Sequence, residues 1–207
     1  MLYQKKIPFR YKGNRNYVHG PDIFDAMLET VHDYFNNYPN EIKGSFHRFL
    51  RNDGMISIYD INQSIKDKII YAIFSIIINE DNYKIVITAS KNLVSSSYDY
   101  DENKVLDTIE YHDDEARMVL KSSYTYMEQI VAITKKLHLT FYPLDNKSWL
   151  ITKIHLIDAI DPAIFPGHML SIKAEKHFHY RLTQNSIFLD DKFLGSIWFS
   201  KPAPEVS

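Results

Sequence analysis

The sequence predicts an α+β protein made of two tandem copies of one unit. Residues 76–91 (IIINEDNYKIVITASK) align without a gap with residues 186–201 (SIFLDDKFLGSIWFSK), and five of the paired positions are identical. A helical spacing of apolar residues precedes each copy, and an acidic segment separates them. We therefore expect units at 1–91 and 117–207, joined by a linker at 92–116. Their strands would form one continuous antiparallel sheet around two helices, which covers the open sheet edges of each unit.

The central helix of the first unit is predicted to begin at Gly20-Pro21-Asp22. Proline near a helix start and an acid in the first turn are typical initiation features. Apolar side chains then recur at helical spacing: Ile23, Phe24, Met27, Leu28, Val31, Tyr34 and Phe35. Pro39 ends the pattern.

Extended segments flank this helix. Strands are expected at about 7–11, 17–19, 42–50, 54–61, 69–79 and 83–90. Asn52-Asp53-Gly54 and Glu80-Asp81-Asn82 have turn compositions, which predicts hairpins at both places.

The same order recurs in the second unit. A short strand at 118–121 precedes a helical stripe of Met127, Ile130, Val131, Thr134, Leu137 and Phe141. Ser122 or Ser123 is the expected N-cap of this helix. Strands follow at 148–160, 169–183, 185–190 and 193–200. The alignment offset grows from 103 at the helices to 108 at His47/His155 and 110 at the last hairpin, as small loop insertions would produce.

Composition excludes several classes of protein. The 207 residues are 45% hydrophobic and contain no cysteine, so disulfides, thiolate nucleophiles and iron–sulfur clusters are ruled out. The longest apolar run, 69–78, is too short to span a membrane, and the first residues do not form a signal peptide. A cytoplasmic location is expected. A net charge of −2 does not favour nucleic acid as a partner.

Charge is unevenly distributed. Residues 92–116 hold eight acids and one base, which is typical of a solvated linker. The first fifteen residues carry five bases and no acid: Lys5, Lys6, Arg10, Lys12 and Arg15. These bases have two interpretations. They could receive the phosphates of coenzyme A or of a carrier-protein prosthetic arm, or protect a solvated edge strand.

A strand, a long central helix and an antiparallel meander, present twice, resemble the double hot-dog fold of the thioesterase/thiol ester dehydratase superfamily. The resemblance covers about 7–91 and 117–201. It implies processing of an acyl thioester, on coenzyme A or acyl-carrier protein, by a thioesterase or a 3-hydroxyacyl dehydratase. It also implies a site where two units meet near the start of a central helix, whose N–H groups polarise the thioester carbonyl. No cofactor is implied, and a homo-oligomer is left open.

The densest polar cluster, residues 14–22, leads into the first helix. His19, Asp22 and Asp25 are the candidate catalytic residues. The candidate substrate-binding residues are Lys12, Arg15, Asn16 and Tyr17. In the competing interpretation Asp22 is an ordinary helix-start acid and the Gly-Pro pair shapes a turn. The second helix lacks a matching cluster, so the resemblance places the competent site in the first unit.

Two further histidine patterns are weaker candidates. Phe165-Pro166-Gly167-His168 looks like a segment of hot-dog dehydratases, but a strand follows it here instead of the central helix, so a loop is expected. His177 and His179 share a strand face with Glu175, too few ligands to predict a metal site. Because no complete catalytic signature is present, the alternative function is a non-catalytic module that binds an apolar ligand or a partner protein.

Overall fold

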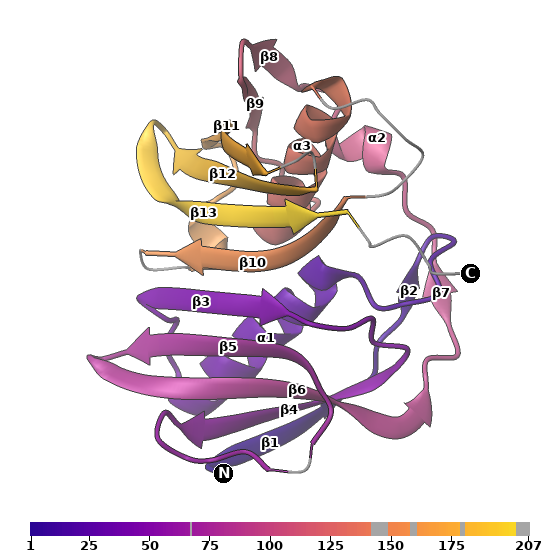
Figure 1. Cartoon of the computed structure of the whole chain (residues 1–207), viewed down its shortest axis with the longest axis vertical. Helices are drawn as coiled ribbons and strands as arrows, with labels where there is room; N and C mark the ends of the chain where they lie inside the picture. Colours follow the sequence, from indigo (N-terminus) through magenta and orange to yellow (C-terminus); the bar gives the residue numbers. More distant parts are fainter. Residues whose placement is uncertain (67, 142–148, 158–160, 179–180, 202–207) are drawn as a thin grey trace. The chain divides into compact units, whose positions relative to one another are not determined.

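The computed structural model describes residues 1–207 except 67, 142–148, 158–160, 179–180 and 202–207. The chain divides into two compact units. Unit 1 comprises residues 1–101 and 155–161, and unit 2 comprises residues 102–154 and 162–207. Each unit has one long helix against an antiparallel sheet (Figure 1), so the predicted α+β class of two similar units is confirmed.

Unit 1 contains one five-stranded antiparallel sheet in the order β1-β4-β6-β5-β3. Its strands are β1 (Tyr3–Ile7), β3 (Glu41–Phe46), β4 (Asn52–Asp60), β5 (Ile70–Ile78) and β6 (Asp81–Leu93). Helix α1 (Gly20–Phe35) is the central helix. A separate pair of short parallel strands, β2 (Tyr11–Lys12) and β7 (Ser97–Tyr98), joins segments that lie far apart in the sequence.

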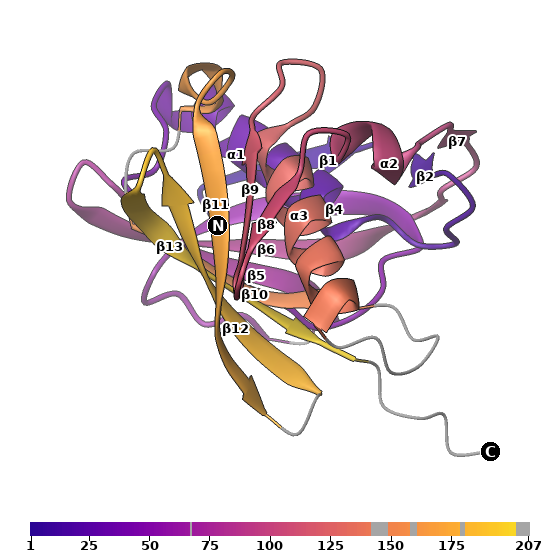
Figure 2. The same cartoon turned by 90° about the horizontal axis from the view of Figure 1, so that it is seen from above.

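Unit 2 also has one long helix and one antiparallel sheet, with six strands in the order β10-β13-β12-β11-β9-β8. Its strands are β8 (Glu110–His112), β9 (Glu115–Val119), β10 (Leu150–Leu156, of which 155 and 156 count with unit 1), β11 (Met169–Phe178), β12 (Leu182–Leu189) and β13 (Lys192–Ser200). Helix α3 (Tyr126–Phe141) lies along this sheet (Figure 2). A short helix α2 (Glu102–Val105) and a 3-10 turn at Pro162–Ile164 complete the unit.

Both central helices follow the predicted pattern except near their C-terminal ends, where Tyr34 and Phe141 are exposed. Phe24, Met27, Leu28 and Val31 of α1 are buried, and the Phe24 ring meets Phe74 of β5 edge to face at 6.0 Å. The aligned α3 residues Met127, Ile130, Val131 and Thr134 are buried as well. Burial of four such apolar side chains contributes on the order of 6–12 kcal/mol. α1 ends at Asn36, whose left-handed conformation (φ 51°) closes the last turn.

Three predictions about the strands were wrong in detail. The first strand is 3–7 rather than 7–11, because Pro8 follows it and has no N–H for the ladder. Residues 17–19 form no strand. No hairpin forms around Asn52-Asp53-Gly54, since β3 pairs with β5 while β4 pairs with β1 and β6.

The repeated hairpins are present in both units but sit differently in the sheets. β5 and β6 are joined at Asn79 and Glu80, and β12 and β13 at Asp190 and Asp191, all with positive φ. In unit 1 β6 lies between β4 and β5, whereas in unit 2 the strands β11, β12 and β13 follow one another. Residues 92–116, expected to be a linker, hold β7, α2 and β8, and Val105 is buried.

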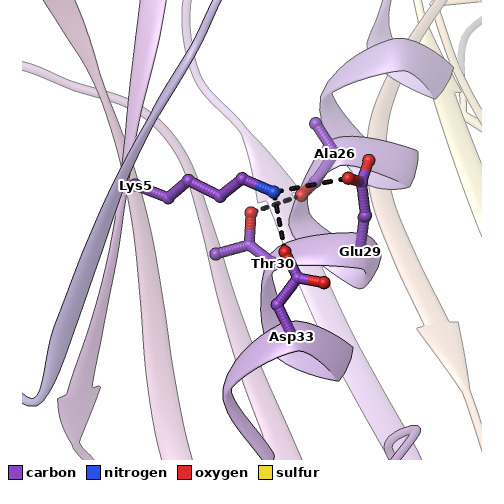
Figure 3. Close-up of polar contacts among 5 residues, drawn as sticks. All are labelled: Lys5, Ala26, Glu29, Thr30 and Asp33. Carbon is purple, nitrogen blue, oxygen red and sulfur yellow. Dashed lines mark hydrogen bonds and ion pairs between the residues drawn. The ribbon is translucent and has the colours of Figure 1, made fainter. Parts of the chain in front are cut away.

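Strand β1 lies at the edge of the unit 1 sheet, and its Lys5 reaches α1. The Lys5 ammonium is 3.3 Å from Glu29 Oε1 and 2.7 Å from Asp33 Oδ2 (Figure 3). In the same helix the Thr30 hydroxyl donates to the Ala26 carbonyl at 2.7 Å. The hydrogen bond to Asp33 raises the pKa of Lys5. This cluster supports the edge-strand interpretation of the basic N-terminus.

Lys5→Met is expected to lower the free energy of unfolding by less than about 1 kcal/mol, because the pair is partly exposed and screened by solvent. The loss should shrink further as salt is added. Urea unfolding at low and high salt measures it. A loss of several kcal/mol that salt does not change would contradict a surface ion pair.

Candidate functional site

Helix α1 begins without a side-chain cap. His19 occupies the N-cap position with extended backbone (φ −68°, ψ 143°), and its side chain makes no capping hydrogen bond to the helix. Its carbonyl accepts the Ile23 N–H at 3.2 Å, and its side chain is buried. The preceding residue, Val18, is anchored by its N–H to the Leu50 carbonyl at 2.8 Å. The first-turn amides of α1 are therefore not used by the side chain of the N-cap residue.

Asp22 is held by a buried lysine. The Lys12 Nζ lies 3.1 Å from Asp22 Oδ1, and the Lys12 side chain is 1% exposed against 19% for Asp22. Asp22 stands in the first turn of α1, where its charge also favours the positive end of the helix dipole. The ammonium group that the sequence suggested for binding phosphate therefore lies inside unit 1.

Tyrosines from β7 and the residues after it surround Lys12. The ammonium lies 4.6 Å from the ring centroid of Tyr100 and 5.8 Å from that of Tyr98. The Arg10 and Arg15 guanidinium groups lie 5.2 Å from the Tyr98 centroid and 5.6 Å from the Tyr100 centroid, respectively. We call Arg10, Lys12, Arg15, Tyr98 and Tyr100 the cation–tyrosine cluster.

Sequence reasoning missed the two tyrosines of this cluster, because they fall in the acidic segment that was expected to be a linker. Their alternate spacing was the available indication, since alternate residues of an extended segment point to one side. Arg15, predicted to bind substrate, also donates to the Lys12 carbonyl at 3.1 Å. It belongs to the cluster and to the turn that precedes α1.

The other predicted residues lie around the same helix start. Asp25 is partly exposed and follows Asp22 by three positions, so the two carboxylates share one side of α1. Asn16 is exposed. The Tyr17 ring packs against Phe49 at 4.5 Å between centroids, in the segment that leads from β3 to β4. His19, Asp22, Asp25 and Lys12 are thus grouped at one end of α1.

The start of α3 is closed by its own side chains. Thr125 Oγ1 accepts the Glu128 N–H at 3.2 Å, and Glu128 Oε2 accepts the Thr125 N–H at 3.2 Å. This is a capping box, so the cap is Thr125 and the prediction of Ser122 or Ser123 was wrong. The buried Gln129 amide accepts the Lys121 N–H at 2.8 Å and donates to the Lys121 and Tyr124 carbonyls. The two helix starts therefore differ chemically.

The predicted loop at 165–168 is confirmed. Phe165 is buried and stacks on Tyr126 at 4.4 Å, and Gly167 has a φ of 89°. His168 Nδ1 hydrogen-bonds Asp190 Oδ2, which lowers the pKa of Asp190. Both side chains are exposed. His177 is exposed, whereas His179 lies outside the described residues.

The described part of the chain contains no group of three or more His, Asp or Glu side chains arranged to hold a metal ion. Nor does any helix in that part have the length and apolar character needed to cross a membrane.

Comparisons with known proteins bear on the fold. No family model matches the sequence, and a search of curated proteins finds no match. Among solved structures, the pyran synthase domain from module nine of the sorangicin pathway matches with a TM-score of 0.54 at 8% identity, over 97% of this chain and 92% of that domain. The chain has a double hot-dog fold.

Two further structures support the same assignment. One, described as an oleoyl thioesterase from Lactobacillus plantarum, matches the hot-dog chain with a TM-score of 0.51 at 10% identity, over 98% of this chain and 96% of its own. The other, the tesB protein of Mycobacterium avium subspecies paratuberculosis, has a TM-score of 0.51 at 9% identity, over 94% and 91%. Both similarities extend over nearly the whole length of each chain, so the hot-dog assignment covers both units.

Proposed function

We propose that this hot-dog protein processes an acyl thioester, carried by coenzyme A or acyl-carrier protein, at the start of α1. The observation that carries the proposal is the contrast between the helix starts. The N-cap side chain of α1 leaves the first-turn amides to other partners, and His19, Asp22 and Asp25 gather there. The start of α3 is closed by Thr125 and Glu128. The description of one structural neighbour as an oleoyl thioesterase supports the substrate class.

The chemistry follows from the helix end. A thioester carbonyl that faces the first turn of α1 would meet N–H donors and the positive end of the helix dipole, which stabilise negative charge developing on its oxygen. Pro21 removes one donor, so the remaining N–H groups of the first turn, with the His19 ring beside them, orient the carbonyl. This stabilisation serves hydrolysis and dehydration alike, because both place charge on that oxygen.

Asp25 is the proposed base, because it follows Asp22 by three positions and lies partly exposed on the same side of α1. In hydrolysis Asp25 takes a proton from water as the water oxygen bonds to the carbonyl carbon; the C–S bond then breaks and the thiolate receives the proton. In dehydration it takes the proton from the carbon next to the carbonyl; the Asp25 carboxyl then returns that proton to the 3-hydroxyl, which leaves as water as the C–C double bond forms. A positioned base of this kind contributes about 10²–10⁴-fold to the rate.

The experiment is an assay of the purified protein with a panel of acyl-CoA and 3-hydroxyacyl-CoA thioesters of different chain lengths. Free thiol reports hydrolysis, and the absorbance of the α,β-unsaturated thioester reports dehydration. Asp25→Asn is expected to lower kcat by about 10²–10⁴-fold, and His19→Ala to lower kcat as well. Glu29→Gln, one turn further along the exposed side of α1, should retain activity.

Neither product from any thioester, together with no acyl-CoA binding, would defeat the proposal. Binding of acyl-CoA without turnover, unchanged by His19→Ala, would favour the non-catalytic binding module instead.

A further inference from the structure

Lys12 lies beside the candidate site, and its side chain is buried away from solvent. We propose that Lys12 is a positioning residue: its ammonium fixes and neutralises Asp22, so that the start of α1 stays receptive to negative charge. This inference rests on the proposed function and assigns a role within that site. It differs from the prediction that Lys12 binds the phosphates of the substrate.

The surroundings of Lys12 fix its ammonium in place. The residue has no exposed surface, and its Nζ is 3.1 Å from Asp22 Oδ1. The Tyr100 ring lies 4.6 Å away and the Tyr98 ring 5.8 Å away, which is the range of cation–π attraction. The lysine side chain is a flexible four-carbon chain, so its burial against two rings removes most of its conformational freedom.

Backbone pairing holds the cation–tyrosine cluster together. The Tyr11 N–H donates to the Ser96 carbonyl at 2.9 Å, and the Gly13 N–H donates to the Tyr98 carbonyl at 2.8 Å. Gly13 has a φ of 58°, and a Cβ there would stand 3.7 Å from the Tyr100 carbonyl oxygen. Glycine thus gives the turn after Lys12 its left-handed conformation. The strands β2 and β7 carry Lys12 and Tyr98 as neighbours in register.

Electrostatics supply the reason for such an arrangement. An ionised Asp22 without a counter-charge would repel the oxyanion that forms at the same helix end, because both are negative. Pairing with Lys12 cancels that repulsion and leaves the helix dipole to act on the substrate. A buried ion pair seldom stabilises a protein more than well-packed apolar residues would. A role in the site therefore explains the pair better than stability does.

The test compares Lys12→Met, Asp22→Asn and the double variant with Lys5→Met. Lys5 is the matched control, because it also pairs with carboxylates of α1, but in the second half of the helix. Amide hydrogen exchange is measured on the protein without substrate. Lys12→Met is expected to speed exchange of the Ile23 amide, which donates to the His19 carbonyl at 3.2 Å, and of the hydrogen-bonded amides of the next turn by about 10-fold or more. Lys5→Met is expected to leave those amides unchanged.

Turnover supplies the second readout. Lys12→Met is expected to lower kcat about 10- to 100-fold with little change in KM, since misplacement at a catalytic site costs rate more than binding. The double variant should recover part of that loss, because the carboxylate that lost the Lys12 ammonium is removed as well. A purely structural role would instead lower the yield of folded protein and leave kcat of the folded fraction unchanged.

If Lys12→Met does not fold, Tyr100→Leu tests the same point, because it removes one ring and keeps the ion pair. It is expected to speed exchange of the same amides. Unchanged exchange and unchanged kcat in the folded variants would overturn the inference. Absence of any thioester turnover in the wild-type protein would defeat the proposed function alone, since the exchange experiment needs no substrate.

Discussion

Asp22→Asn is expected to destabilise unit 1 by about 3–5 kcal/mol, the cost of leaving a buried charge without its partner. The Lys12 side chain is 1% exposed, so its ammonium has little water to replace the lost carboxylate. Lys12→Met should cost less, because the carboxylate that it leaves behind is partly exposed. The loss is measured as the free energy of unfolding in urea, followed by far-ultraviolet circular dichroism.

The double variant Lys12→Met/Asp22→Asn completes the cycle. It is expected to be more stable than Asp22→Asn alone, since both charges are removed together. Lys5→Met, with a loss below about 1 kcal/mol, serves as the control for an exposed pair. Additive losses in the double variant would show that Lys12 and Asp22 do not stabilise each other.

Acid should weaken unit 2 through His138. The pKa of His138 is lowered to about 4, mainly because the ring is buried. The hydrogen bond to Asn185 acts in the opposite direction, and the positive charge of Lys201 lowers the pKa further. His138 Nε2 lies 3.0 Å from Asn185 Oδ1, and the Asn185 amide nitrogen has acceptors in Thr183 and Ile197. That network assigns the Nε2–H tautomer to a neutral ring. The rings of Trp149 and Phe199 cover it, at 4.6 and 5.3 Å.

The sign of the effect follows from linkage. An unfolded histidine titrates near 6.5, whereas folded His138 stays neutral down to about 4, so the unfolded chain binds more protons in between. The contribution of neutral His138 to the free energy of unfolding is thus fully present above about pH 6.5. It is lost as the pH falls toward 4. The expected loss is about 2 kcal/mol at pH 5 and about 3 kcal/mol below pH 4.

Fluorescence of Trp149, which packs against His138, follows this transition in urea between pH 7 and 4. His138→Gln keeps a donor for Asn185 and should lower stability at pH 7 while flattening its dependence on pH. His112→Gln, on the exposed strand β8, should leave the wild-type pH dependence intact. An unchanged pH dependence in His138→Gln would show that another group is responsible.

Local sequence patterns were sufficient for the two central helices and for the repeated hairpin. The Gly20-Pro21-Asp22 start and the apolar spacing after it gave α1, because helix initiation and amphipathicity depend on neighbours in the chain. The aligned segments 76–91 and 186–201 gave two hairpins of the same form. The resemblance in element order gave the hot-dog fold.

Gly54 shows why a local pattern can mislead. Asp53-Gly54 has the composition of a tight turn, yet both residues lie inside β4. A Cβ on Gly54 would stand 2.6 Å from Phe9 Cε2, and Asp53 Oδ1 accepts the Phe9 N–H at 3.1 Å. The glycine is needed for close approach by a distant residue rather than for a turn, and no window of neighbouring residues contains that information.

The candidate site divides in the same way. The sequence alone was enough to propose His19, Asp22 and Asp25 at the start of α1, since all three lie within one stretch of chain. Only the tertiary structure placed Lys12 against Asp22 and enclosed it with Tyr98 and Tyr100, which lie more than eighty positions away in the sequence. Helix starts are set by local hydrogen bonding, whereas the burial of a charge depends on which distant groups the fold brings around it.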